Sequence, residues 1–263
     1  ITLEIDPARH QVVSKKAHNV IVQSIPYTSA TGLRENTTLY PQFQPRADIL
    51  EYVKRYVDAS KAFTTRPIGK LSGPATRGDG AESAFGGTLG NLIADAQLAA
   101  TRSAGAQIAF MNPFGLRAPI VPGADGTVTF GDLYQTQPFG NEVVTETMTG
   151  AEIKATLEQG FDSNGPEQVL SPSAGFSFRF DRSRPIGDRI VAMTFNGKPL
   201  DLKARYRVTV NGFLALGGDT FSGFVGKPDQ VTGPTDMEAL ESWVKAVPLR
   251  TVPAEVRAAP VGR

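Results

Sequence analysis

Cysteine is absent from the 263 residues, and histidine occurs only twice, as His10 and His18. Without cysteine the chain can form neither disulfides nor thiolate metal sites, although this says little about its compartment. Two isolated histidines cannot build a two-metal hydrolytic centre, because such a centre needs ligands that hold both ions. We therefore expect both histidines to be solvated or structural.

The chain also has little net charge and no long apolar run. Lys and Arg number 27 against 26 Asp and Glu, which gives a net charge of +1. This balance offers no electrostatic attraction for a nucleic-acid backbone or an anionic membrane, so we expect no nucleic-acid partner. No apolar stretch approaches the roughly 20 residues needed to cross a bilayer, so we expect no membrane span.

Common catalytic signatures are missing as well. There is no nucleophile-elbow pattern and no Gly-x-x-x-x-Gly-Lys phosphate loop. Ser83 precedes a helical pattern and is better interpreted as a helix cap. Carboxylates such as Asp132 and Glu142 have no spacing that indicates acid–base work. We expect neither a catalytic nor a metal-binding residue in this chain.

The pattern along the chain divides it into three parts. It begins at Ile1 without Met or a signal peptide, so we expect it to be processed or to be a piece of a longer protein. Residues 1–45 combine short alternating runs that we expect to be strands, among them Asn19–Val22, with a polar irregular stretch. Residues 46–66 contain a helical apolar pattern and are expected to connect to a main domain over residues 67–263.

The main domain mixes helical and strand patterns. We expect a layered mixed-sheet domain with helices, of the α/β (α+β) class. The Asn196-Gly197 pair predicts a hairpin, and Thr235 with Glu238 predicts a capping box at the last helix. Helices are expected over 83–102, 150–161 and 235–247, and strands over 107–111, 142–148, 176–180, 190–195 and 206–210; residues 127–130 begin another unit.

Two short aromatic segments, residues 137–141 and 211–219, stand out between these strands. Each places a phenylalanine, Phe139 or Phe213, beside glycine and a polar side chain. Either phenylalanine alone would more often be a core residue or fill a turn. If folding brings the two together, they could hold a flat ring from both faces, and base–aromatic stacking contributes about 1–3 kcal/mol per base.

The polar residues of these segments suit a nucleobase or nucleoside. The Asn141 amide could read a polar base edge, and the Asp219 carboxylate could accept hydrogen bonds from two neighbouring hydroxyls, such as those of ribose. Gly217 and Gly218 would let the backbone approach a ligand closely. The segments therefore predict a pocket for a small nucleotide or nucleoside.

A third segment, Met111–Arg117, follows a predicted buried strand. Ligands in α/β sheets usually bind at the carboxyl ends of strands, so Arg117 could face an anionic group such as phosphate. It could equally be a solvated surface arginine, and the spacing leaves both interpretations open.

These pieces together resemble the carboxy-terminal domain of the 5′-nucleotidase family. The run from Glu82 to Gln97 is similar to the first helix of that domain, and the three segments follow in the family's order over residues 67–250. The resemblance implies that Phe139 and Phe213 sandwich the base, Asn141 meets the base edge and Asp219 holds the ribose hydroxyls.

The same resemblance implies that Arg117 attracts the phosphate. The family has a further arginine before the first helix, and Arg77 is the nearest candidate here. This chain departs from the family at Pro113-Phe114-Gly115, where relatives often have a Gly-rich run. Phe114 either narrows the phosphate end of the pocket or simply packs.

The resemblance also implies a catalytic half that this chain does not contain. In the family, an amino-terminal metallophosphoesterase domain holds a pair of divalent metals with Asp, His and Asn ligands. Residues 1–45 would be only its last strands and loop, so no cofactor is expected in this chain. The parent enzyme would hydrolyse nucleoside phosphates to nucleoside and phosphate, whereas this fragment alone would be inactive.

Other functions remain open within this interpretation. The same fold could act on cyclic nucleotides, nucleotide sugars or another phosphate or sulfur ester. It could also be a non-catalytic nucleoside-binding module, although the strand-like residues 1–26 argue against that. Because the family is mostly exported, we expect a periplasmic or secreted protein.

Overall fold

The computed structural model describes residues 1–23, 27–29, 32–34, 36–41, 43–78 and 85–262, which fall into two compact units, Ile1–Ala59 and Ser60–Arg263. Ser83, the expected helix cap, lies outside these residues. The first unit contains the antiparallel pairs β1 (Thr2–Asp6) with β2 (Gln11–Lys16), and β3 (Tyr27–Ser29) with β4 (Gly32–Arg34). Asn19–Val22 was wrongly predicted as a strand; these exposed residues have no pairing strand in the described part of the chain.

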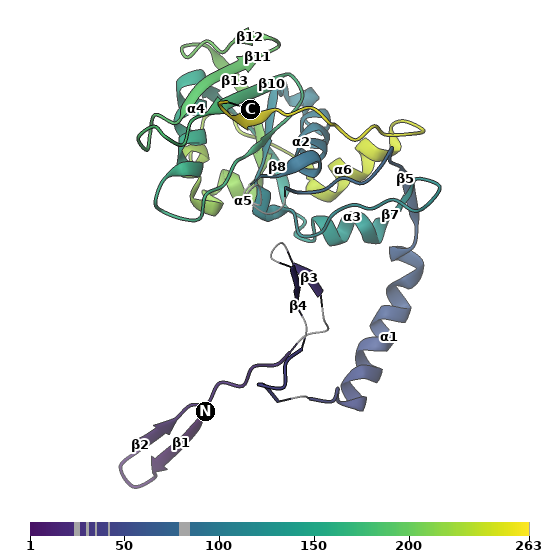
Figure 1. Ribbon diagram of the computed structural model, residues 1–263, viewed down its shortest axis with the longest axis vertical. Helices are drawn as coiled ribbons and strands as arrows, with labels where there is room; N and C mark the ends of the chain where they lie inside the picture. The colour runs from purple at the N-terminus through teal and green to yellow at the C-terminus, as the bar shows by residue number, and fades with distance from the viewer. Residues whose placement is uncertain (24–26, 30–31, 35, 42, 79–84, 263) are drawn as a thin grey trace. The chain divides into compact units, whose positions relative to one another are not determined.

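A five-stranded mixed sheet organises the second unit (Figure 1). Its strand β13 runs parallel to β6 and antiparallel to β8, which in turn runs antiparallel to β14. The carboxyl ends of β6, β13 and β14 and the amino end of β8 therefore lie along the same side of the sheet, where the strands end; we call this side the sheet edge. The order is β14 (Val231–Thr235), β8 (Glu142–Thr149), β13 (Arg205–Asn211), β6 (Ile108–Met111) and β9 (Ser171–Pro172).

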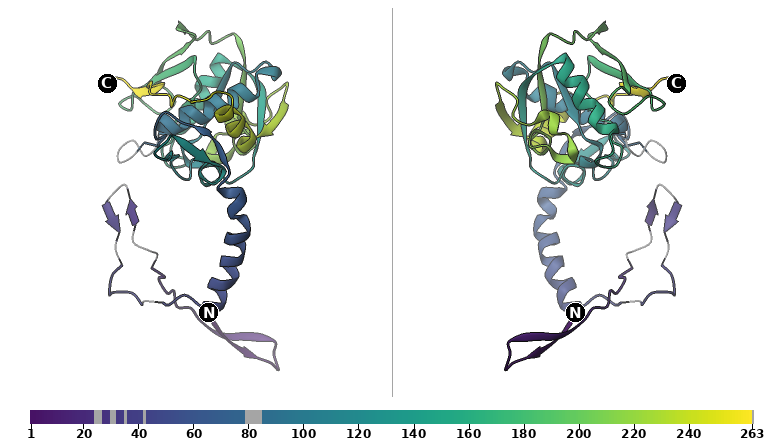
Figure 2. Two further views of the ribbon diagram at one scale, coloured as in Figure 1. Left: turned by 90° about the vertical axis from the view of Figure 1, so that its right-hand side faces the viewer. Right: turned by 90° about the vertical axis from the view of Figure 1, so that its left-hand side faces the viewer.

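A four-stranded sheet lies beside it. Asn196 and Gly197 form the predicted hairpin turn, with φ of 50° and 76°. The yellow carboxyl-terminal segment in Figures 1 and 2 ends in β15, which pairs with β10 in parallel. The order is β12 (Lys198–Pro199), β11 (Ile190–Phe195), β10 (Phe176–Phe180) and β15 (Ala258–Pro260); β5 (Pro67–Lys70) and β7 (Thr127–Thr129) form a separate pair.

The helices continue from strand ends and loops of these sheets. The capping box predicted at Thr235 and Glu238 is present, with hydrogen bonds in both directions. The helices are α1 (Ala47–Thr64), α2 (Gly87–Ala100), α3 (Phe130–Thr136), α4 (Gly150–Glu158), α5 (Gly212–Ala215) and α6 (Asp236–Lys245). Short 3-10 turns are η2 (Arg102–Ala104), η3 (Pro113–Gly115), η4 (Gln159–Phe161), η5 (Gly218–Thr220) and η6 (Ser222–Phe224).

The two larger hydrophobic clusters of the described residues lie on opposite faces of the five-stranded sheet. Side chains alternate along β6, so Ile108 and Phe110 pack with α4 and the second sheet, whereas Met111 packs with α2 and α6. Helices, a mixed sheet and a second sheet therefore form layers, which confirms the predicted α/β class.

Candidate functional site

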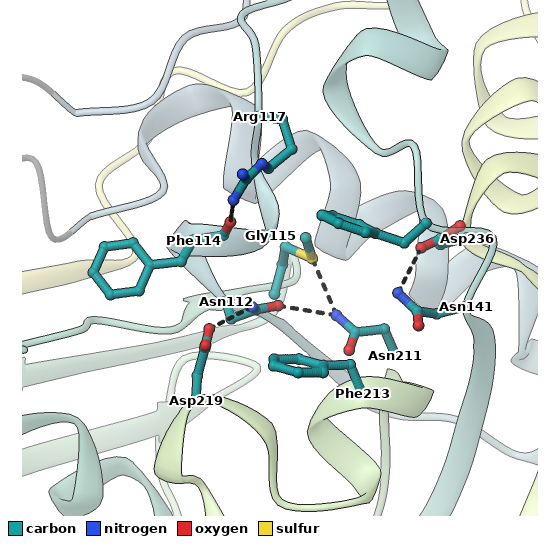
Figure 3. Close-up of a pocket in the computed structure, with 11 residues that line it drawn as sticks. Asn112, Phe114, Gly115, Arg117, Asn141, Asn211, Phe213, Asp219 and Asp236 are labelled. Atoms are coloured by element: carbon teal, nitrogen blue, oxygen red, sulfur yellow. Dashed lines mark hydrogen bonds between the residues drawn. The ribbon is translucent and has the colours of Figure 1, made fainter. Parts of the chain in front are cut away.

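A pocket of about 260 Å³ opens at the sheet edge where β6, β13 and β14 end and β8 begins. Its volume lies near the lower end of small-molecule sites, which run from about 300 to 1,000 Å³. Each of the three sequence segments reaches it. Figure 3 shows its lining residues: Met111, Asn112, Phe114, Gly115, Arg117, Phe139, Asn141, Asn211, Phe213, Asp219 and Asp236.

The two phenylalanines line this one pocket although 74 positions separate them in the sequence numbering, 139 to 213. Neither is a core residue, because Phe139 is 51% exposed and Phe213 is 45% exposed. Large apolar side chains left half open to solvent at a pocket are typical of ligand contacts. The structure therefore brings together the aromatic pair, by which we mean Phe139 and Phe213.

Gly217 and Gly218 follow Phe213 and contribute to the pocket indirectly. Neither Gly217 nor Gly218 is a lining residue. Gly217 has φ of 84°, a conformation that glycine adopts without strain. A Cβ atom on Gly218 would lie 2.4 Å from Cε1 and 2.5 Å from Cδ1 of Phe213. The Phe213 ring thus lies against the bare backbone of Gly218, and a side chain at that position would displace the ring.

Asp219 is fixed by a chain of amides. Asn112 Nδ2 donates to Asp219 Oδ2 over 2.7 Å, and Asn211 Nδ2 donates to Asn112 Oδ1 over 3.0 Å. Asn211 Oδ1 in turn accepts from the Leu214 N–H at the start of α5. Asp219 itself has φ of 52°, an uncommon value for a residue other than glycine. The carboxylate is therefore held in place at the pocket by residues from two neighbouring strand ends.

Arg117 and Arg77 both contact the η3 turn. Arg117 lines the pocket, and its Cζ is 5.8 Å from the ring centre of Phe139. Arg77 does not line it; its Nη1 donates to the Pro113 carbonyl, and its Cζ is 5.4 Å from the Phe114 ring centre. Burial and the positive charge of Arg117 lower the pKa of Arg77. A bound anion near both guanidinium groups would reduce this repulsion. Phe114 both lines the pocket and packs against Arg77.

Sequence reasoning missed Asp236 as a pocket residue. It is the first residue of α6, is 2% exposed and receives a long hydrogen bond of 3.4 Å from Asn141 Nδ2. Burial raises the pKa of Asp236, while hydrogen bonds from Met237 and Asn141 lower it in part. The capping-box pattern explains residues 235–238 as the start of a helix. Nothing in the local sequence therefore indicates that the Asp236 carboxylate also faces the pocket.

Side chains of the pocket do not fit a two-metal hydrolytic centre. Asp219 and Asp236 are the carboxylates that line it, and Figure 3 shows them at different ends. Among the described residues, no group of three His, Asp or Glu side chains could hold a metal ion. No helix in the described part of the chain is long and apolar enough to cross a membrane.

The layered fold and its strand-edge pocket define a ligand-binding domain, and the chain belongs to the 5′-nucleotidase C-terminal domain family, whose model matches residues 67–226. The crystal structure of a 5′-nucleotidase precursor from Thermus thermophilus superposes with a TM-score of 0.71 and 33% identity. That match covers 81% of this chain and 43% of the other.

Two curated proteins show similar levels of identity. The trifunctional nucleotide phosphoesterase protein YfkN of Bacillus subtilis is 37% identical over 144 residues, which is 52% of this chain and 10% of that protein. The cell wall protein Lmo0130 of Listeria monocytogenes is 32% identical over 166 residues, 60% of this chain and 21% of that protein. The chain thus spans less than half the length of each of these relatives.

Proposed function

We propose that this chain is the substrate-recognition part of a 5′-nucleotidase-like phosphohydrolase and that its pocket binds a nucleoside or nucleoside monophosphate. The observation that carries the proposal is the aromatic pair, two half-exposed phenylalanines that line one pocket at a strand edge. Apolar ring faces on two strand-end segments suit a flat base. Family membership and the names of the nucleotidase relatives support the same choice.

Each polar group of the pocket then has a role. Asn141 hydrogen-bonds the base edge, and Asp219 accepts hydrogen bonds from the ribose hydroxyls. Arg117 binds the phosphate, and Arg77 adds positive charge behind the η3 turn. The arginines suit this role because a guanidinium presents a planar fork of donors that matches phosphate oxygens. A nucleic-acid strand is not the proposed ligand, since the net charge of +1 offers little overall attraction for a phosphate backbone.

We assign catalysis to a part of the parent protein outside this chain. In this proposal residues 1–45 are the last strands and loop of a metallophosphoesterase domain, residues 46–66 connect, and residues 67–263 bind the nucleotide. A divalent metal pair would belong to that other domain. The comparison with a cell wall protein supports an exported, periplasmic or secreted location. Phosphate release by the full parent, together with none from this chain, would support the assignment; release by this chain alone would contradict it.

Calorimetric titration of the chain with a small ligand panel tests the proposed function. AMP and adenosine should bind, and ribose 5-phosphate should bind far more weakly because it lacks a base to stack on the aromatic pair. Equal binding of ribose 5-phosphate and AMP would contradict the proposal. Tighter binding of cyclic AMP or of a nucleotide sugar than of AMP would favour the other ester substrates. Binding of adenosine without a gain from phosphate would favour a non-catalytic nucleoside-binding module.

A further inference from the structure

Asp236 is a buried carboxylate on the pocket wall to which the proposed function gives no role. Its backbone N–H donates to the Asn141 carbonyl over 2.7 Å, and its Oδ2 accepts from Asn141 Nδ2 over 3.4 Å. Its other oxygen, Oδ1, accepts from the Met237 N–H over 2.8 Å. Two hydrogen bonds thus join the start of α6 to the residue proposed to read the base.

This pairing decides which way the Asn141 amide faces. Both oxygens of Asp236 accept hydrogen bonds, Oδ2 from Asn141 Nδ2 and Oδ1 from the Met237 N–H, so the NH₂ group of Asn141 turns toward Asp236 and its carbonyl oxygen turns away. Figure 3 shows the Asn141 nitrogen directed at Asp236 and its oxygen pointing elsewhere. Within the described residues, Asn141 Oδ1 accepts no hydrogen bond from the protein.

The position of Asn141 in the pocket suits the base rather than the ribose. In Figure 3 Asn141 and Asp236 lie at one end of the pocket and Asp219 with Asn112 at the other. Phe213 lies between the two ends in this view. A nucleoside whose hydroxyls reach Asp219 would therefore extend its base toward Asn141.

We propose that Asp236 is a positioning residue that sets base specificity by holding Asn141 Oδ1 as an acceptor for the ligand. This inference rests on the proposed nucleoside function and names the bases it would favour. An acceptor pairs with an exocyclic amine, such as the 6-amino group of adenine or the 4-amino group of cytosine. The O6 atom of a 6-oxopurine would face Asn141 Oδ1, so that two acceptors meet, unless the base shifted between the rings of Phe139 and Phe213. Two facing acceptors leave both groups without a hydrogen bond, which weakens binding.

Calorimetry on the whole chain with adenosine, inosine and purine riboside tests this inference. Adenosine should bind about tenfold more tightly than inosine, with purine riboside in between because it offers neither donor nor acceptor at position 6. In Asp236→Asn the new side chain can donate as well as accept, so Asn141 can turn either way. The adenosine preference should then fall to within about twofold, through weaker adenosine and stronger inosine binding.

Glu238→Gln is the matched control, because it removes a charge from the first turn of the same helix outside the pocket. Its adenosine-to-inosine ratio should equal that of the parent. Equal binding of the three nucleosides by the parent, or an unchanged preference in Asp236→Asn, would overturn the inference. If Asp236→Asn does not fold, the ranking of the three ligands by the parent decides. Failure of the proposed function is distinct, since none of the nucleosides would then bind.

Discussion

Asn112 donates a hydrogen bond of 2.7 Å to the carboxylate of Asp219 and so ties the end of β6 to the loop that follows β13. The two residues are 107 positions apart. This link places an acceptor group at one end of the pocket, on a residue whose backbone is left-handed with φ of 52°. The surrounding contacts stabilise a conformation that costs about 1–3 kcal/mol in isolation.

Replacing Asp219 should weaken ribose recognition selectively. Asp219→Asn keeps a side chain that tolerates positive φ but removes the charge that strengthens hydrogen bonds from hydroxyls. We expect adenosine to bind about 10- to 150-fold more weakly, which corresponds to the 1.5–3 kcal/mol of a hydrogen bond to a charged group. Calorimetry with 2′,3′-dideoxyadenosine should show no such change.

Asp229→Asn provides the control for this substitution. Asp229 also has positive φ, 58°, and its carboxylate accepts from Thr147 outside the pocket. The affinity of Asp229→Asn for adenosine should match that of the parent. If Asp219→Asn weakened dideoxyadenosine as much as adenosine, Asp219 would not read the ribose.

Gly218→Ala should displace the Phe213 ring. The added Cβ would lie 2.4–2.6 Å from three ring atoms, far inside van der Waals contact, so the ring must turn away. We expect about tenfold weaker adenosine binding, because one stacking face contributes about 1–3 kcal/mol, with little change in thermal stability. Gly73→Ala is the control, since a Cβ there meets no atom within 4 Å. Unchanged adenosine affinity in Gly218→Ala would contradict this account of the glycine.

Arg117→Ala should remove the extra affinity that a phosphate gives. AMP should bind about tenfold more weakly than to the parent, as expected for lost hydrogen bonds between charged groups. Adenosine should be nearly unaffected. Arg77→Ala should act in the same direction but more weakly, because Arg77 does not line the pocket.

Parallel titrations of AMP and adenosine measure how much affinity the phosphate adds in the parent and in Arg117→Ala. Two salt concentrations are used because salt screens the attraction between the arginine and the phosphate. The exposed Arg179, on β10, serves as the control through Arg179→Ala. An equal loss for AMP and adenosine in Arg117→Ala would show that Arg117 supports the Phe139 ring and does not bind phosphate.

Glu146→Gln should stabilise the protein most at neutral and higher pH. Glu146 is fully buried on β8, its Oε1 has no partner, and burial raises its pKa from 4.5 to about 7. The folded state therefore binds more protons than the unfolded state between those pH values. Stability is lost as pH rises from 4.5 through 7, by about 3 kcal/mol in total.

Denaturant unfolding from pH 4.5 to 8 measures this effect. The stability advantage of Glu146→Gln should grow across that range and then level off, because the neutral amide carries no charge into the core. Glu142→Gln, at an exposed position of the same strand, should show no such trend. An advantage for Glu146→Gln that stays constant with pH would contradict the prediction.

The sequence was sufficient for the features that depend on local chemistry. Alternation predicted β10 and β11, and the Phe139 and Phe213 segments were found because glycine and polar residues interrupt strand patterns. Helix α3 was missed because it has only 7 residues, although its capping box of Thr129 and Asp132 resembles the one recognised before α6.

The polar wall of the pocket could not be predicted in the same way. Asp236 and Asn141 are 95 positions apart and meet only because β14 pairs with β8. Local sequence already explained Asp236 as the first residue of a capped helix, so its pocket contact left no separate signal. Specific contacts between distant strand ends depend on the sheet order, which periodicity does not determine.

Calorimetric titration of adenosine into the parent chain, Phe139→Ala and Phe213→Ala tests the central claim most directly. Each substitution should weaken binding by about 1–3 kcal/mol, which is about 5- to 150-fold, because each removes one stacking face. Phe43→Ala, at an exposed phenylalanine of the first unit, should bind like the parent. If Phe139→Ala and Phe213→Ala both bind adenosine as tightly as the parent, the aromatic pair does not hold the base.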